Sequence, residues 1–316
     1  MLLQIQELRK HFPLGRNQIV RAVDGVSLAL AEGTVTGLVG ESGSGKSTLG
    51  KTTIGLLDKT GGEVRFRGKV LPARYRARDF RQQLEEIQMI FQDPYSSLNP
   101  RLTVREIIAE PLAFGLAVQD SAREARIAAS LARVGLSADH LGRYPHELSG
   151  GQRQRVGIAR ALILEPKVVI CDEPVSALDV SVQAQVANLL LDLQHSMALT
   201  LLLIAHDLAL VRHLSDRIAI MYLGSLMEEG PTDEVYGAPA HPYTQALIAA
   251  RPEPDPRREH RRIRALITGE IARRPDRPSG CCFAPRCPRA VERCRYEVPQ
   301  LRPLSGGRLV ACHLAQ

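Results

Sequence analysis

One short stretch of the chain has the residue types and the spacing of a phosphate-binding loop. Two glycines, Gly40 and Gly45, are separated by four residues and followed directly by Lys46 and Ser47. Glycine lets successive backbone N–H groups turn towards phosphate oxygens, the lysine reaches the β- and γ-phosphates, and the serine hydroxyl ligates Mg²⁺. A glycine turn that only opens a helix would not require Lys and Ser here. The run therefore predicts a nucleoside triphosphate site formed by Gly40, Glu41, Ser42, Gly43, Ser44, Gly45, Lys46, Ser47 and Thr48.

A pair of carboxylates, Asp172 and Glu173, follows the apolar run at residues 168–171. A carboxylate at the end of such a strand can hold the Mg²⁺ ion of a bound nucleotide, and a neighbouring Glu can polarise water for attack on the γ-phosphate. Taken alone, the pair could equally be a helix cap and a solvated acid. Downstream of a phosphate-binding loop, the hydrolytic role is favoured.

Five of the six cysteines lie near the C-terminus, in the pattern Cys281-x5-Cys287-x6-Cys294-x17-Cys312 with Cys282 in addition. Four thiolates suit tetrahedral Zn²⁺ or a [4Fe–4S] cluster, but the spacing matches neither common zinc-ribbon pairs nor ferredoxin runs. Disulfides would be unexpected in a protein of the cytoplasm. Reduced thiols in a loosely folded tail are the plain alternative. The spacing does not decide among zinc, a cluster and free thiols.

The elements around these residues predict an α/β fold. An apolar run at 35–39 leads into the glycine loop and a helical pattern, and two further apolar runs lie at 168–171 and 201–205, with a helix expected at 182–197. Short apolar runs with polar residues at their C-terminal ends are typical of a parallel sheet covered on both faces. Residues 104–136 are helical in pattern without a strand signal, which indicates a helical insertion.

Composition divides the 316 residues into two parts. The final stretch from Arg251 holds 15 of the arginines against seven acids, whereas residues 1–250 carry 26 Lys and Arg against 27 acids. The bulk of the chain is thus neutral, and its longest apolar run, at 199–205, is far shorter than the roughly 20 residues of a membrane span. We expect a boundary near Arg251, a stiff proline-rich linker at 252–256, and neither a membrane span nor a secretory signal.

The run Leu148–Gln152 resembles the signature motif of ABC transporter ATPases and stands before a helix-forming stretch at 153–164. The resemblance implies that the γ-phosphate of ATP is contacted by Ser149, Gly150, Gly151 and Gln152. Phe91-Gln92-Asp93 resembles the family's Q-loop, which implies that Gln92 contacts Mg²⁺ and the attacking water. His206 resembles the switch histidine, so the catalytic residues implied are Glu173, His206 and Gln92.

Two weaker matches complete the set. Residues 176–179 resemble the D-loop at the dimer interface, although helix capping would explain Ser176 or Asp179 equally well. Phe12 lies where the family stacks an aromatic ring on the adenine, but it could also be a core residue.

The runs at 91–101, 172–181 and 241–244 narrow the resemblance to the ATPases of dipeptide and oligopeptide importers, of the F type, although nickel-importer ATPases share several of them. The implied fold is a RecA-like parallel-sheet core with an antiparallel β subdomain and a helical subdomain at about 93–147. These form an ATPase domain over 1–250, followed by a C-terminal cysteine-rich regulatory extension over 251–316.

The implied function is ATP binding and hydrolysis, with Mg²⁺, in a peripheral subunit on the cytoplasmic face of the cell membrane that powers peptide uptake. The implied partners are a second, different ATPase, two permeases that dock on the helical subdomain, and an extracytoplasmic peptide-binding protein. No nucleic acid is expected. The alternatives are an importer of another substrate such as nickel, or a nucleic-acid-associated ABC ATPase.

The cysteine pattern resembles the C-terminal motif of the peptide importers, which implies a [4Fe–4S] cluster held by Cys281, Cys287, Cys294 and Cys312. Cys282 could replace Cys281 as a ligand. The surrounding arginines would offset the charge of an anionic cluster. We expect most of them to form a solvated face.

Overall fold

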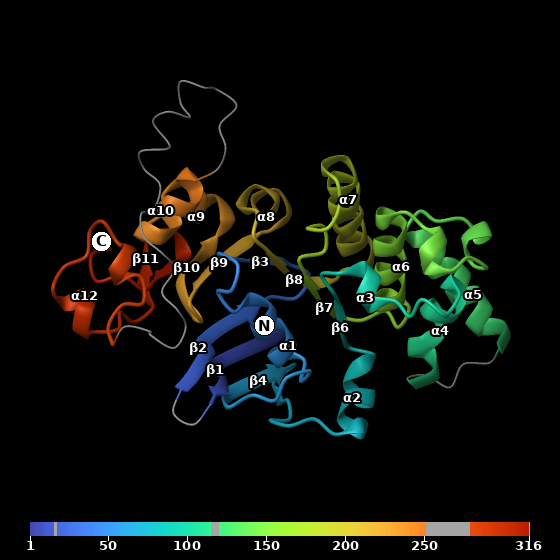
Figure 1. The fold of residues 1–316 in the computed structure, drawn as a ribbon, viewed down its shortest axis with the longest axis horizontal. Coiled ribbons are helices and arrows are strands. Elements are labelled where there is room, and N and C mark those ends of the chain that lie inside the picture. The colour runs from blue at the N-terminus through green and yellow to red at the C-terminus, as the bar shows by residue number, and fades with distance from the viewer. Residues whose placement is uncertain (16–17, 115–119, 251–278, 316) are drawn as a thin grey trace.

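The computed structural model describes residues 1–15, 18–114, 120–250 and 279–315, and the description below refers to these. They form an eight-stranded main sheet and a four-stranded antiparallel sheet. Figure 1 shows the main sheet across the centre of the molecule, with a helical lobe at one end and the C-terminal segment at the other. The expected boundary at Arg251 and the linker at 252–256 lie outside the described residues.

The main sheet is parallel in its centre and antiparallel at one edge. Its order is β11-β12-β10-β9-β3-β8-β7-β6, and the strands from β9 to β6 are parallel. Every residue of the three strands expected from apolar runs is buried, as a sheet covered on both faces requires. The strands are β3 (Val35–Val39), β6 (Ile87–Ile90), β7 (Val168–Asp172), β8 (Thr200–Ala205), β9 (Arg217–Tyr222), β10 (Ser225–Pro231), β11 (Arg302–Leu304) and β12 (Arg308–Val310).

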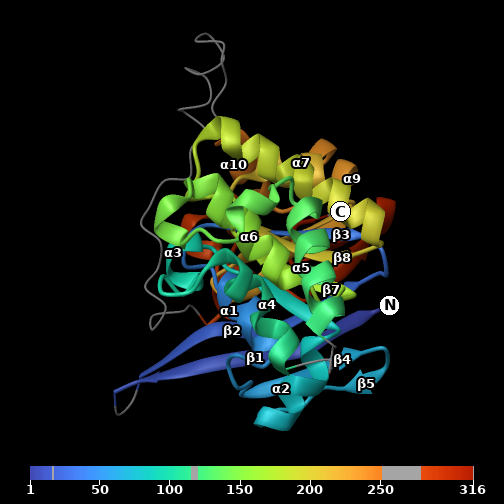
Figure 2. The same ribbon diagram turned by 90° about the vertical axis from the view of Figure 1, so that its right-hand side faces the viewer.

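The antiparallel sheet forms a separate layer on one face of the main sheet, as the turned view in Figure 2 shows. Its order is β2-β1-β4-β5, and helix α1 (Lys46–Thr53) lies between it and the main sheet. Along β8, Leu202 and Ile204 face this layer whereas Leu201 and Leu203 face the opposite core, the period of two expected of a strand. The strands are β1 (Leu3–Leu14), β2 (Gln18–Leu30), β4 (Gly61–Phe66) and β5 (Lys69–Val70).

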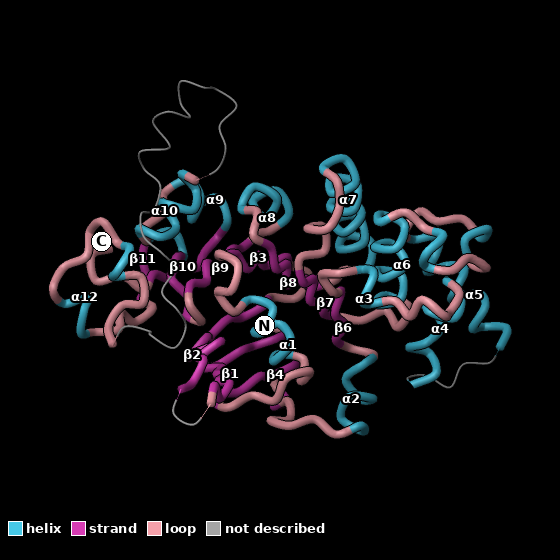
Figure 3. Tube along the Cα trace, viewed as in Figure 1, coloured by secondary structure: helices cyan, strands magenta, loops and turns pink. Residues whose placement is uncertain are grey.

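Helices cover the opposite face of the main sheet and form the lobe beyond β6 (Figure 3). The lobe contains α3 (Pro94–Ser97), α4 (Val104–Phe114), α5 (Asp120–Arg133) and α6 (Gly150–Leu162). Of these, α4 and α5 lie within residues 104–136, where the sequence predicts a helical insertion. No described helix is long and apolar enough to cross a lipid bilayer. The other helices are α2 (Ala77–Leu84), α7 (Val180–Met197), α8 (Leu208–Leu214), α9 (Thr232–Gly237) and α10 (Pro242–Ala249), with 3₁₀ turns at Ala138–His140 and Pro145–Glu147.

Residues 279–315, here called the C-terminal module, pack against residues of the preceding part of the chain. Strand β12 pairs with β10 and so extends the main sheet, and the module's Phe283 is 1% exposed. The Phe283 ring lies edge-on to Tyr222 at 5.4 Å between centroids and contacts Tyr243 at 5.3 Å. The module also contains α12 (Arg293–Tyr296) and 3₁₀ turns at Ala284–Arg286 and Ser305–Gly307.

Candidate nucleotide-binding site

The phosphate-binding loop connects the end of β3 to the first turn of α1. Gly45 has φ 110°, in the left-handed region that favours glycine, and a Cβ there would lie 2.0 Å from the Ala22 carbonyl oxygen. A Cβ on Gly40 would lie 2.1 Å from the Met221 carbonyl oxygen. Both glycines are therefore required by the close packing of the loop on neighbouring backbone.

Two loop side chains are already directed by hydrogen bonds. Lys46 is 4% exposed, and its Nζ donates to the carbonyl oxygens of Gly40 at 2.8 Å and Glu41 at 3.1 Å. The Ser47 hydroxyl donates to Asp172 Oδ1 at 2.6 Å, which joins the loop to the end of β7. A hydroxyl and a carboxylate in contact are the oxygen donors that Mg²⁺ prefers, so this pair fits a magnesium site.

Asp172 lies in a desolvated position. Burial raises its pKa, while the Ser47 hydroxyl and the ammonium groups of Lys51 and Lys46 act against the rise. Burial disfavours the ionised form of this carboxylate, and a nearby cation would stabilise that form. This supports the assignment of Asp172 as a ligand of Mg²⁺.

Glu173 is held in an unusual backbone conformation with φ 46°. Its carboxylate Oε2 accepts a hydrogen bond from Gln92 Nε2 at 3.0 Å and lies 3.3 Å from His206 Nδ1. Left-handed conformations are uncommon for residues other than glycine and concentrate at functional sites. The structure thus brings together the three side chains predicted to be catalytic.

The phosphate-binding loop, Gln92, Glu173 and His206 line one cavity of about 430 Å³ at the carboxyl ends of the parallel strands, and Asp172 lies behind Ser47 without lining it. This is the edge of an α/β sheet at which ligands generally bind. It places nine predicted residues around one space: Ser42, Gly43, Gly45, Lys46, Ser47, Thr48, Gln92, Glu173 and His206. Such an arrangement can bind phosphates on the loop and direct a water molecule with Glu173.

The signature segment lies elsewhere, at the start of α6, and does not line this cavity. Ser149 is the N-cap of α6: its Oγ accepts from the Gln152 N–H at 3.3 Å, and Gln152 Oε1 accepts from the Ser149 N–H at 2.9 Å. Ser149 is exposed, whereas Gly150 and Gly151 are half-buried. The signature segment and the cavity are therefore separate features of the described chain.

Two other predicted positions have local roles in the structure. Phe12 is 36% exposed on β1, so it is not a core residue, and it does not line the cavity. The Lys10 ammonium lies 4.8 Å from its ring centroid. Asp179 caps α7 by accepting from the Val182 N–H at 3.0 Å, and this hydrogen bond is the main cause of its lowered pKa.

The four cysteines predicted as ligands gather within the C-terminal module. Burial raises the pKa of Cys281, and the nearby thiols of Cys294 and Cys287 raise it further. Burial also raises the pKa of Cys287, to which the thiols of Cys312 and Cys294 contribute in the same direction. Cys282 points away, with its Sγ 3.9 Å from the Tyr222 carbonyl oxygen and 4.0 Å from Met227 Sδ. Within the described ranges, no three or more His, Cys, Asp or Glu side chains are placed to hold a metal ion.

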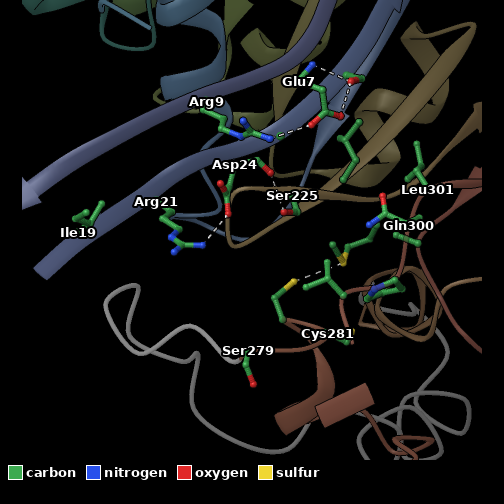
Figure 4. A pocket seen from close by; sticks show the side chains of 18 of the residues that line it. Glu7, Arg9, Ile19, Arg21, Asp24, Ser225, Ser279, Cys281, Gln300 and Leu301 are labelled. Carbon is green, nitrogen blue, oxygen red and sulfur yellow. Dashed lines mark hydrogen bonds and ion pairs between the residues drawn. The ribbon is translucent and has the colours of Figure 1, made fainter. Parts of the chain in front are cut away.

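A second cavity, of about 620 Å³, lies between the antiparallel sheet and the C-terminal module (Figure 4). The charges at its rim pair with one another, since Arg9 contacts Glu7 at 3.2 Å and Arg21 contacts Asp24 at 3.6 Å. Its lining shares no residue with the nucleotide cavity.

Sequence comparison places the chain among known proteins. The family profile described as ABC transporter matches residues 23–176, and that of the oligopeptide/dipeptide transporter C-terminal region matches 227–294. The chain is 52% identical over 314 residues to the putative oligopeptide transport ATP-binding protein YkfD of Bacillus subtilis, covering 99% of this chain and 95% of that one. It is 52% identical over 312 residues to the oligopeptide transport ATP-binding protein OppF of Salmonella typhimurium, covering 95% and 92%.

Solved structures of the same fold agree. The ATP-binding cassette MJ0796, solved as a dimer in a post-hydrolysis state with ADP and phosphate, is 29% identical with a TM-score of 0.67, covering 73% of this chain and 98% of that one. CbiO1 from Clostridium perfringens is 29% identical with a TM-score of 0.66, covering 75% and 91%. These matches confirm the predicted α/β fold of an ATP-binding cassette.

Proposed function

This chain belongs to the ABC transporter family of ATPases, and we propose that the cavity beside residues 42–48 is where it binds and hydrolyses ATP. It is an ATP-binding subunit of a peptide importer, in which ATP hydrolysis is coupled to uptake. The observation that supports the proposed site is the convergence of the phosphate-binding loop, Gln92, Glu173 and His206 on one cavity.

In this proposal the side chains have separate tasks. Lys46 and the loop N–H groups bind the β- and γ-phosphates, and Ser47 and Asp172 would hold Mg²⁺. When bound, Mg²⁺ would neutralise charge on the phosphates. Gln92 and His206 orient Glu173, which accepts a proton from the attacking water. The oxygen of this water bonds to the γ-phosphorus, and the bond from the γ-phosphorus to the bridging oxygen breaks, so that ADP leaves.

We propose that Ser149–Gln152 completes the nucleotide site of a second, different ATPase subunit, and that Phe12 stacks on the adenine. The separation of the signature segment from this chain's own cavity supports the first assignment. A Glu173→Gln variant held with ATP should co-purify that ATPase and two permeases from membranes. Recovery of nucleic acid alone would contradict the importer assignment.

An apolar hollow of about 350 Å³ is the proposed docking place of a permease helix. It lies between the segment that follows α1, helix α2, strand β6 and the helical lobe, and two of its lining side chains, Leu56 and Phe114, are 47% and 56% exposed. Phe114→Glu should weaken co-purification of permeases and leave ATP binding unchanged. Val70→Glu, at an apolar side chain 53% exposed on β5, is the matched control.

We further propose that Cys281, Cys287, Cys294 and Cys312 hold a [4Fe–4S] cluster. Among the described residues these side chains are not already arranged as a group of three or more metal ligands, so the proposal does not rest on such an arrangement. The proposal rests on the donor chemistry of four thiols in one module, of which Cys287 interacts electrostatically with Cys281, Cys294 and Cys312. The inward direction of Cys282 favours Cys281 as the ligand. Protein purified without oxygen should contain about four irons per chain, and stoichiometric zinc without iron would overturn the assignment.

The importer function itself is tested by uptake. Cells that express the chain with its partner ATPase, permeases and peptide-binding protein, with both ATPases on the cytoplasmic face of the membrane, should accumulate a labelled oligopeptide, and Lys46→Ala should abolish this. Lys69→Ala, at an exposed lysine on β5, is the control. Lys46-dependent accumulation of nickel instead of peptide would contradict the assignment of substrate.

A further inference from the structure

The C-terminal module reaches the phosphate-binding loop through one arginine. Arg286 Nη1 donates to Glu41 Oε2 at 2.8 Å, and Nη2 donates to Glu41 Oε1 at 3.1 Å. The side chains are 8% and 23% exposed, so water screens this paired contact little. Two parallel hydrogen bonds between a guanidinium and a carboxylate fix both orientation and distance. Arg286 is thus an exception to the solvated arginine face expected for this region.

A second contact holds the same loop residue by its backbone. The Glu41 N–H donates to the Tyr243 hydroxyl at 3.0 Å, and the Tyr243 ring is fully buried. Arg286 Nη1 also donates to the Tyr222 hydroxyl at 3.3 Å. Glu41 is therefore held at its side chain by the module and at its N–H by α10.

Glu41 stands where its position controls the loop. It follows Gly40, and its carbonyl oxygen accepts from Lys46 Nζ at 3.1 Å. The residues after it, Ser42 and Gly43, line the nucleotide cavity. A shift of Glu41 would therefore move both the lysine and the N–H groups that face the phosphates.

The module is held firmly enough to act as an anchor. Arg286 ends a 3₁₀ turn that begins beside Phe283, whose ring packs in the aromatic cluster with Tyr222 and Tyr243. On its other side the module borders the cavity of about 620 Å³ in Figure 4. The module therefore contacts the phosphate-binding loop through Arg286, although a cavity separates another part of the module from the antiparallel sheet.

We propose that Arg286 and Tyr243 are positioning residues that hold Glu41, so that the C-terminal module maintains the phosphate-binding loop in its ATP-binding shape. Neither side chain lines the nucleotide cavity. Each acts through the loop backbone. The inference rests on the proposed nucleotide site, because it concerns the affinity of that site for ATP.

The test measures ATP affinity with the purified full chain and turnover in the assembled transporter, both with Mg²⁺. Arg286→Gln should raise the Kd for ATP about tenfold, which corresponds to about 1.4 kcal/mol. The kcat at saturating ATP should change by less than about twofold, because no group in the cavity is removed. The Kd for ATP of Arg286→Lys should lie between those of the unmodified chain and of Arg286→Gln, since a lysine keeps the charge and loses the paired geometry.

Matched variants make the result decisive. Arg293→Gln removes an arginine of the same module that is 61% exposed and paired with Glu297, and it should leave the Kd unchanged. Tyr243→Phe removes only the hydroxyl that accepts from Glu41 and should weaken ATP binding in the same direction, which provides a test if Arg286→Gln fails to fold. By thermodynamic reciprocity, ATP should slow hydrogen exchange in residues 281–294.

An unchanged Kd in both Arg286→Gln and Tyr243→Phe would overturn the inference. If Lys46→Ala abolishes ATP binding in the same assay, that failure concerns the positioning role alone. If Lys46→Ala binds ATP as well as the unmodified chain does, the proposed nucleotide site is wrong and the inference is overturned with it.

Discussion

Glu173 combines a strained backbone with a well-directed carboxylate. Its φ of 46° turns the chain just after β7, and its N–H donates to the Ile204 carbonyl oxygen at 2.9 Å. Such a conformation costs of order 1–3 kcal/mol and is kept where the surrounding structure enforces it. Here it aims the carboxylate at Gln92 and His206 within the cavity.

Replacement of Glu173 by Gln should retain ATP binding and lower turnover by about 10²-fold or more, because an amide of the same shape cannot accept the proton of the attacking water. The measurement is ATP binding and single-turnover hydrolysis in the assembled transporter. Glu165→Gln is a suitable control, since Glu165 also has a positive φ, of 55°, but contacts Arg133 in the helical lobe. Near-normal turnover of Glu173→Gln would show that another group activates the water.

Asp172→Asn should stabilise the nucleotide-free protein and remove most of the stabilisation given by Mg²⁺ with ATP. Burial raises the pKa of Asp172, so the folded chain binds its proton more tightly than the unfolded chain does. The free energy of unfolding therefore falls as pH rises from 3.8, the ordinary pKa of aspartate, through the higher pKa of Asp172 in the folded chain. At neutral pH the ionised carboxylate thus destabilises the nucleotide-free protein.

Thermal unfolding at pH 7.5 with and without nucleotide checks this prediction. Asn keeps an oxygen that can accept from Ser47, so the difference isolates the charge. Asp192→Asn, at an exposed position on α7, should have no effect in either condition. A lower Tm for nucleotide-free Asp172→Asn would contradict the prediction.

At the scale of elements, helix α10 begins at a buried neutral histidine. His241 is 1% exposed, its Nδ1 accepts from the Tyr243 N–H at 3.0 Å, and its ring lies 5.7 Å from that of Phe283. Burial lowers its pKa from 6.5 to about 4. This N-cap therefore places Tyr243 against the phosphate-binding loop only while the imidazole is uncharged.

His241 should make the protein lose stability as pH falls from 6.5 towards 4. In that window the unfolded chain binds a proton at His241 and the folded chain does not, so the free energy of unfolding decreases by about 3 kcal/mol from this group. Urea unfolding at a series of pH values should show a shallower slope for His241→Asn, whose amide oxygen can still cap the helix. His195→Asn, at an exposed position on α7, should retain the original slope; an equal slope in both variants would refute the role of His241.

The elements that could be predicted are those with strong local patterns. The apolar runs at 35–39, 168–171 and 201–205 became β3, β7 and β8 because strands buried on both faces carry few polar residues. The phosphate-binding loop and the Asp172–Glu173 pair were also visible, since chemistry restricts their residue types and spacing.

Contacts between distant elements left no local pattern. The pairing of Arg286 with Glu41 joins residues 245 positions apart, and an arginine in a basic stretch looks the same whether it is solvated or buried. Cys282 and Phe283 are both buried directly before the 3₁₀ turn at Ala284–Arg286, and no sequence period marks either as a core residue. The run His241-Pro242-Tyr243 matches the resembled family, but its residue types do not indicate the hydrogen bond that the Glu41 N–H donates to the Tyr243 hydroxyl.

At the scale of the whole molecule, the cavity and the signature segment are separate features of one chain. The cavity lies at the carboxyl ends of β3, β7 and β8, whereas Ser149 begins α6 in the helical lobe (Figure 1). If each ATP is bound between the loop of one subunit and the signature segment of another, damage to Ser149 must affect the partner's site rather than this chain's own.

Ser149→Arg in the assembled transporter should therefore leave ATP binding at Lys46 of this chain unchanged. It should lower hydrolysis at the partner's loop by about tenfold or more, because a bulky cation replaces a small hydroxyl at a helix N-terminus. Photolabelling of each chain with an ATP analogue, followed by turnover measurement, separates the two effects. Loss of the N-cap costs about 1 kcal/mol, and Thr103→Ala, which removes a hydroxyl that accepts from the Glu106 N–H in the same lobe, controls for it. Weaker labelling of this chain, with the partner's hydrolysis intact, would mean that the signature segment acts within its own subunit and that the proposed pairing is wrong.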